Sequence, residues 1–193
     1  MFKELCATLF LLCNPLLNGF TFNYDGNPQD QFVQGIAECT VLNNAVIEPR
    51  YRVVVAISVA QAILESDWGR SRFAVECNNY YGIIETDNTE PHIKSKNSNV
   101  LLKKYGNRCE SVADYIALLN ASSAFVEYRQ LRLQQYITDN VDVFLIIETL
   151  ENYAIDPEYR QKLLAVTLGL FEKYPQIFKS KQIWEYYNNN KNT

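Results

Sequence analysis

The chain of 193 residues contains a single histidine, His92. Metal sites built from several imidazoles are excluded by that count, and a Ser/His or Cys/His nucleophilic mechanism would depend on this one residue. His92 lies in a polar stretch without a partner motif, so we interpret it as a solvated loop residue. The sequence also lacks a glycine-rich phosphate-binding loop. We therefore expect neither a bound metal nor a cofactor.

Positive charge is also scarce. The chain has 18 Lys and Arg against 22 Asp and Glu, a formal net charge of -4 and a pI near 5.1. This balance argues against nucleic acid as a main partner, because nucleic-acid binding needs a basic surface. Aromatic residues are abundant, with 13 Tyr and 10 Phe. Their faces stack well on sugar rings but also fill cores, so the count agrees with a glycan ligand without requiring one.

The longest apolar run outside the central part of the chain lies at the N-terminus. Residues 1–20 carry the basic residue Lys3 near their start, continue with an apolar stretch and end near the small residue Gly19. This length favours a secretory signal peptide over a transmembrane helix, with an uncleaved anchor as the alternative. We expect one domain over 21–175 and a C-terminal tail over 176–193. The protein is thus expected to be an exported monomer of the periplasm, cell envelope or medium, touching a membrane only through an uncleaved N-terminal segment.

Cysteine usage fits an exported protein. Cleavage of the signal would remove Cys6 and Cys13 and leave Cys39, Cys77 and Cys109. Three cysteines allow at most one intramolecular disulfide in an oxidising compartment. Cys77 and Cys109 bracket the predicted hairpin and are the predicted pair, with three buried free thiols as the alternative.

The rest of the chain is organised around an apolar segment that ends in a carboxylate. Residues 53–64 are nearly all apolar, and Ser58, Gln61 and Glu65 are spaced three and four apart, so they form one polar seam on a helix. Gly69 is placed to end that helix in a left-handed conformation, which puts Glu65 in its last turn. A carboxyl group desolvated at such a rim has a raised pKa and can act as a general acid. The alternative is a structural ion pair with Arg70 or Arg72.

Helical patterns dominate the remaining sequence, and one strand-like region interrupts them. The predicted hairpin lies between Tyr81 and Tyr105, around a polar tip. Other helices are expected over 32–47, 71–77, 124–136 and 141–150, from an N-cap at Ser111, and after an N-cap at Asp156. The fold class is therefore mostly α (α+β).

Three motifs carry a family resemblance. AQAILESDWGRSRFA at 60–74 and NNYYGI at 78–83 closely resemble the A-Q-x-x-x-E-S-x-W-G-x-S-x-F-A and N-N-x-F-G-I elements of bacterial peptidoglycan glucosaminidases, glycoside hydrolase family 73. YAIDPEY at 153–159 resembles the Y-A-T-D-P-x-Y element. Two positions depart from the family, since Tyr81 replaces Phe and Ile155 replaces Thr. The resemblance covers about residues 32–171 and implies a lysozyme-like fold, with the hairpin beside the substrate cleft.

The resemblance also implies catalytic roles. Glu65 would be the proton donor of a glycosidase. Glycosidases usually need a second carboxylate, which the resemblance places in the hairpin, where Glu85, Asp87 and Glu90 are available. Glu85 is the predicted choice, because it adjoins the apolar strand residues nearest the cleft. A 2-acetamido group of the substrate acting as the nucleophile is the alternative.

Further residues are expected at the substrate site. By carry-over Tyr153 would face the cleft and hydrogen-bond the sugar or its acetamido group, with a core tyrosine as the alternative. Trp68 could stack on sugar, although packing beneath Glu65 is favoured. The residues expected to line or shape the substrate site are Gln61, Trp68, Asn79, Tyr80 and Tyr81.

Together these features predict a peptidoglycan hydrolase. The resemblance implies an endo-β-N-acetylglucosaminidase that cleaves the β-1,4 bond after N-acetylglucosamine, with peptidoglycan glycan strands as its partner. A lytic transglycosylase or muramidase of related fold would use the same single Glu. A cell-wall-binding module without turnover is a further alternative.

Overall fold

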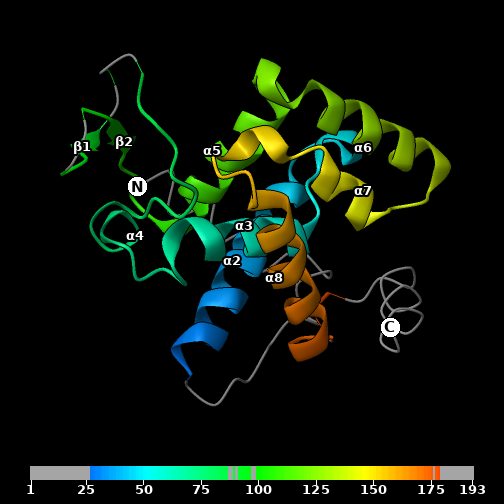
Figure 1. Ribbon diagram of the computed structural model, residues 1–193, viewed down its shortest axis with the longest axis horizontal. Coiled ribbons are helices and arrows are strands. Elements are labelled where there is room, and N and C mark those ends of the chain that lie inside the picture. The colour runs from blue at the N-terminus through cyan, green and yellow to red at the C-terminus, as the bar shows by residue number, and fades with distance from the viewer. Residues whose placement is uncertain (1–26, 87–88, 90, 97–98, 176, 179–193) are drawn as a thin grey trace.

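A computed structural model describes residues 27–178 except 87–88, 90, 97–98 and 176 (Figure 1). The predicted signal segment, most of the predicted tail, and the candidate acids Asp87 and Glu90 lie outside the described residues. The described chain is mostly helical. Its helices are α2 (Pro28–Ala45), α3 (Val55–Ser66), α4 (Arg72–Cys77), α5 (Arg108–Ala121), α6 (Val126–Thr138), α7 (Val143–Glu148) and α8 (Tyr159–Lys173), with 3-10 turns η1 (Pro49–Tyr51), η2 (Ser123–Phe125) and η3 (Glu151–Tyr153).

Helix α3 lies at the centre of the fold, packed against α2 and α8 (Figure 1). Its sequence is rich in alanine and aliphatic residues, which can be buried on every face, and nine of its twelve residues are buried. The helix ends where Asp67 adopts the left-handed conformation, φ 51°, and Trp68 and Gly69 continue with φ 57° and 76°. The predicted left-handed stop thus exists, but it begins two residues before Gly69. Glu65 lies in the last turn, as predicted.

Helices α2 and α5 pack along each other and are joined by a disulfide between Cys39 and Cys109. The predicted Cys77–Cys109 pair is therefore wrong, and Cys77 is a buried free thiol. The reason is tertiary: helix packing brings the Cα atoms of Cys39 and Cys109 to 4.8 Å across 70 residues of sequence. The Asn43 side chain reinforces this contact by donating to the Cys109 carbonyl at 3.2 Å.

The predicted hairpin is present. Strand β1 (His92–Lys94) pairs antiparallel with β2 (Leu101–Lys103), and Ile84 forms a further bridge to Leu102. His92 therefore lies in a strand, with an exposed side chain, rather than in a loop. The hairpin packs on α4, at the edge of the helical body (Figure 1).

Two helix starts differ from the prediction: another side chain caps α5, and the N-cap residue of α8, Glu158, makes no side-chain cap. Asn107, not Ser111, caps α5, and its side chain accepts from the Glu110 N–H at 3.1 Å. Ser111 is buried in the first turn instead. Asp156 accepts from the Glu158 N–H at 2.9 Å, but α8 begins only at Tyr159.

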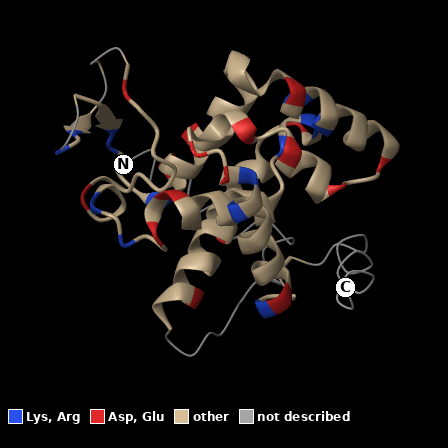
Figure 2. Cartoon of the chain, viewed as in Figure 1, with Lys and Arg blue, Asp and Glu red and all other residues tan. Residues whose placement is uncertain are grey.

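Helices α4, α5, α6 and α8 carry both charge signs, whereas α2, α3 and α7 carry acidic residues without Lys or Arg (Figure 2). In the described residues, no helix has the length and apolar character needed to cross a membrane.

Candidate active site

The Glu65 side chain is half-buried at the C-terminal end of α3. The backbone of Gly82 faces it from the loop that follows α4, and a Cβ at Gly82 would lie 3.6 Å from Glu65 Oε2. Gly82 has φ 67°, a left-handed conformation that favours glycine, and the loop takes this conformation where it meets the carboxyl group. The position matches the rim that the sequence predicted, neither sealed in the core nor fully exposed to solvent.

Burial raises the pKa of Glu65 above its ordinary value, and a hydrogen bond from the Tyr159 hydroxyl opposes that rise. Loss of hydration is the larger effect, because it penalises the charged form. A carboxyl group shifted in this direction keeps its proton at higher pH than a solvated glutamate. That is the property a general acid requires.

The alternative of a structural ion pair has little support around Glu65. Arg70 pairs with Asp67 at 2.7 Å, and Arg72 pairs with Glu76 at 3.2 Å. The Arg72 guanidinium also donates to the Lys94 carbonyl at 2.8 Å, which ties α4 to β1. Both arginines therefore have partners other than Glu65.

Tyr153 lies beside the Glu65 carboxyl group in a cluster of tyrosine rings. Its ring stacks on Tyr159 with centroids 5.8 Å apart and meets Tyr115 edge-on at 6.2 Å. Burial raises the pKa of Tyr153 well above its ordinary value, and the neighbouring Tyr159 and Glu65 add to this. The hydroxyl donates to the Tyr81 carbonyl at 3.1 Å. The structure thus brings Tyr153 together with Glu65, although they are far apart in sequence.

Glu85 is 5% exposed. It lies at the base of the hairpin, where its N–H donates to the Leu101 carbonyl at 2.9 Å. The nearby Glu85 charge also contributes to the raised pKa of Tyr105, after burial and Asp114. This environment differs from that of an ordinary solvated loop acid.

Three of the residues expected at the substrate site are buried supports of the surrounding loop. The Asn79 amide donates to the carbonyls of Ile83 and Lys103 and accepts from the Ile83 N–H. Tyr81 is 2% exposed, and its hydroxyl bonds to Ser58 at 2.8 Å. Tyr80 is also buried. These side chains hold the loop that carries Gly82 rather than present themselves to a ligand.

Gln61 and Trp68 also have structural surroundings. Gln61 is fully buried, and both ends of its amide are engaged by tyrosines. Because no surface of Gln61 is exposed, it does not line a substrate site as expected. Trp68 is half-buried and packs edge-on against Phe32 at 6.5 Å, the packing role favoured from the sequence.

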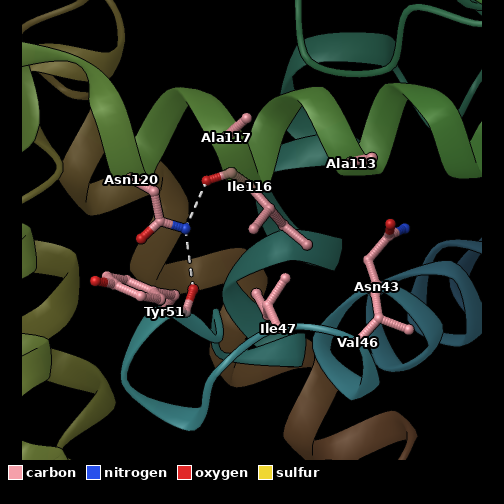
Figure 3. Close-up of a pocket in the computed structure, with 8 residues that line it drawn as sticks. All are labelled: Asn43, Val46, Ile47, Tyr51, Ala113, Ile116, Ala117 and Asn120. Atoms are coloured by element: carbon pink, nitrogen blue, oxygen red, sulfur yellow. Dashed lines mark hydrogen bonds between the residues drawn. The ribbon is translucent and has the colours of Figure 1, made fainter.

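A cavity of about 370 Å³ lies elsewhere, between the end of α2, η1 and α5 (Figure 3). Its walls are mainly apolar, and the Asn120 amide donates to the carbonyls of Tyr51 and Ile116. The Asn43 amide likewise donates to two backbone carbonyls. With these donors engaged and most of the wall apolar, the cavity offers few polar groups to sugar hydroxyls. Over the described ranges, no three His, Cys, Asp or Glu side chains gather as a metal site requires.

Comparison with known proteins gives the family of this chain. The family model "Glucosaminidase: Mannosyl-glycoprotein endo-beta-N-acetylglucosaminidase" matches residues 45–170, which include α3, the hairpin and most of α8. The chain belongs to the glucosaminidase family. Family membership confirms the predicted class of enzyme, a glycosidase.

One curated relative in this family is the exo-glucosaminidase LytG of Bacillus subtilis (strain 168). It is 30% identical over 139 residues, which are 67% of this chain and 47% of LytG. The chain therefore spans about half the length of that relative.

Solved structures of glucosaminidase-type domains share the fold. The catalytic domain of the autolysin Auto from Listeria monocytogenes matches with a TM-score of 0.59 at 21% identity, covering 82% of this chain and 90% of that one. The glycoside hydrolase domain of Salmonella typhimurium FlgJ matches with a TM-score of 0.59 at 21% identity, covering 86% and 99%. The predicted fold class, a mostly helical lysozyme-like domain with a small hairpin, is confirmed.

Two residues of the site were not singled out from the sequence. Tyr159 contacts Glu65 directly. The sequence could have marked Tyr159, because it is the last residue of the YAIDPEY motif. Tyr115 reaches the site through Gln61, and only its place on the inner face of a helix marked it. Both become visible once α8 packs on α3 and the Tyr115 hydroxyl of α5 reaches Gln61.

Proposed function

We propose that this chain is a peptidoglycan hydrolase that cleaves the β-1,4 bond after N-acetylglucosamine, with Glu65 as the general acid. One observation supports this most. Glu65, the acid that the A-Q-x-x-x-E-S-x-W-G motif specifies, lies half-buried at a helix end with a raised pKa. Among the residues that the structure describes, its neighbours include two tyrosines and Gly82, and Arg70 and Arg72 pair with other acids.

In this proposal Glu65 donates its proton to the glycosidic oxygen as the bond to the anomeric carbon breaks. Positive charge then develops at that carbon and must be stabilised from the opposite side. Glu85 is the candidate protein group, and the carbonyl oxygen of the substrate's 2-acetamido group is the alternative. Tyr153, next to Glu65, is proposed to contact the sugar through the lone pairs that its hydroxyl retains.

The proposal places the enzyme outside the cytoplasm. Its disulfide is a bond that oxidising compartments maintain and the cytosol reduces. Residues 1–20, with the composition of a signal peptide, are proposed to direct export. Peptidoglycan in the cell envelope is then directly accessible to the domain.

Mass spectrometry of digested sacculi tests the proposed bond specificity. New reducing ends that carry N-acetylglucosamine support the proposal. Ends of 1,6-anhydromuramic acid overturn it in favour of a lytic transglycosylase, and reducing N-acetylmuramic acid overturns it in favour of a muramidase. Binding to sacculi without any release of fragments identifies a wall-binding module instead.

The same digest separates two modes of cleavage. The family description is that of an endo-acting enzyme, whereas the curated relative is named an exo-glucosaminidase. Endo cleavage, which the family resemblance implies, would produce a broad early distribution of glycan lengths. Exo cleavage releases disaccharide units from the start and leaves long strands nearly intact.

A further inference from the structure

We propose that Tyr115, Gln61 and Tyr159 form a buried positioning device for Glu65. This proposal rests on the proposed function. The chain of hydrogen bonds keeps one oxygen of the Glu65 carboxyl group as an acceptor. The proton that Glu65 delivers is therefore carried on its other oxygen, away from Tyr159.

The chain joins three helices that are distant in sequence. The Tyr115 hydroxyl of α5 donates to Gln61 Oε1 at 2.5 Å, and Gln61 Nε2 of α3 donates to the Tyr159 hydroxyl oxygen at 2.9 Å. Tyr159 of α8 then hydrogen-bonds Glu65, one turn after Gln61 on α3. Tyr115 and Gln61 are fully buried and Tyr159 is 4% exposed, so water does not compete for these bonds.

The order of donors is fixed by the chemistry of each group. An ionised carboxylate can only accept, so the single proton of Tyr159 must point to Glu65. The Tyr159 oxygen is then free to accept, which suits the amide nitrogen of Gln61. The Gln61 oxygen in turn accepts from Tyr115. One arrangement thus satisfies every group from the core to the carboxylate.

The asymmetry of the Gln61 amide prevents this order from reversing. If Tyr159 turned to donate to Gln61, the amide would have to rotate, and the Tyr115 proton would lose Gln61 Oε1 as its acceptor. A buried group left without its partner costs about 1–3 kcal/mol. Tyr159 therefore remains a donor when Glu65 takes up a proton, and that proton attaches to the oxygen that Tyr159 does not occupy.

Few titratable groups act on Glu65 from the elements around it. Tyr159 faces it from α8 and Tyr153 from η3, and burial raises the pKa of both hydroxyl groups, so both stay neutral over the range in which a carboxyl group titrates. Asp67, two residues on at the end of α3, is paired with Arg70. Changes in the titration of Glu65 can therefore be assigned to the hydrogen-bond chain.

Matched Tyr→Phe variants test the device. The carboxyl pKa of Glu65 is measured by NMR in the full chain labelled with ¹³C-glutamate, with the signal assigned by its loss in Glu65→Gln. Tyr159→Phe removes the donor to the ionised form, so the pKa should rise by about one unit, a tenfold change in proton affinity. Tyr115→Phe, which does not touch Glu65, should also raise the pKa, because Gln61 can then rotate and draw away the Tyr159 proton. Tyr128→Phe, the same change at a buried tyrosine of α6 that bonds Arg132, should leave it unchanged.

Gln61→Met shows whether the coupling passes through the amide. This variant should raise the pKa of Glu65, and adding Tyr115→Phe to it should produce no further change. In turnover assays Tyr159→Phe should lower kcat with KM little altered, and move the alkaline limb of the pH profile upward. If Tyr115→Phe behaves like Tyr128→Phe, or if Tyr159→Phe and Gln61→Met leave the pKa unchanged, the device does not exist. Because the NMR titration needs no turnover, the expected pKa pattern without sacculus cleavage would overturn the proposed function but not the device.

Discussion

Loss of the Cys39–Cys109 disulfide should destabilise the domain strongly. The bond closes a loop across a sequence separation of 70 residues. In the chain-entropy model, a loop of that length restricts the unfolded chain by roughly 4 kcal/mol at 25 °C. For a domain of this size, each kcal/mol shifts the melting temperature by about 2–4 °C, so the loss should be about 8–16 °C. The bond also fastens α2 to α5, and α5 carries Tyr115.

The perturbation is the double variant Cys39→Ala/Cys109→Ala, with Cys77→Ala as the matched single-thiol control. Thermal unfolding followed by circular dichroism, with and without a reductant, measures the effect. The wild type and Cys77→Ala should lose stability on reduction, whereas the double variant should melt low in both buffers. Peptide mapping without reduction should find Cys39 linked to Cys109. A double variant that melts within about 2 °C of the oxidised wild type would refute the reasoning.

Two further predictions concern Glu65 and the glycines. Because the folded pKa of Glu65 is raised, the folded state binds more protons than the unfolded state between the ordinary and the raised pKa, and stability falls as pH rises through that window. Glu65→Gln should therefore raise the melting temperature at pH 7 and lose that advantage below about pH 4.5, and an equal gain at both pH values would contradict the cause. Gly69→Ala should destabilise by about 1–3 kcal/mol, because φ is +76° and the new Cβ would meet the Phe32 ring at 2.8 Å. A Cβ at Gly169, within α8, would lie in open space, so Gly169→Ala should instead raise the free energy of unfolding in urea by about 0.5–1 kcal/mol. If both variants changed the free energy of unfolding in the same direction, local conformation would not decide the outcome.

The parts of the fold that depend on local sequence could be predicted. The buried α3 follows from its apolar composition, and the left-handed stop predicted at Gly69 placed Glu65 in its last turn. The hairpin followed from the change in pattern after Tyr81. The errors at Ser111 and Asp156 are also local, because Asn107 caps α5 in place of Ser111, and Asp156 accepts from the turn that precedes α8.

What could not be predicted depends on contacts between distant segments. Cys109 is closer in sequence to Cys77, but the packing of α2 on α5 selects Cys39. Gln61 was expected to face a ligand because it is polar, whereas tyrosines from α5 and α8 enclose it. Polarity along a helix shows that a side chain needs hydrogen-bond partners, but not whether substrate or protein supplies them.

The most direct test compares the wild type with Glu65→Gln on purified sacculi, by the rate at which new reducing ends are released. Positioned general acids contribute about 10²–10⁴-fold to rate, so the variant should lose activity by at least about a hundredfold while folding and still binding sacculi. If the folded Glu65→Gln protein cleaves within tenfold of the wild-type rate, Glu65 is not the proton donor.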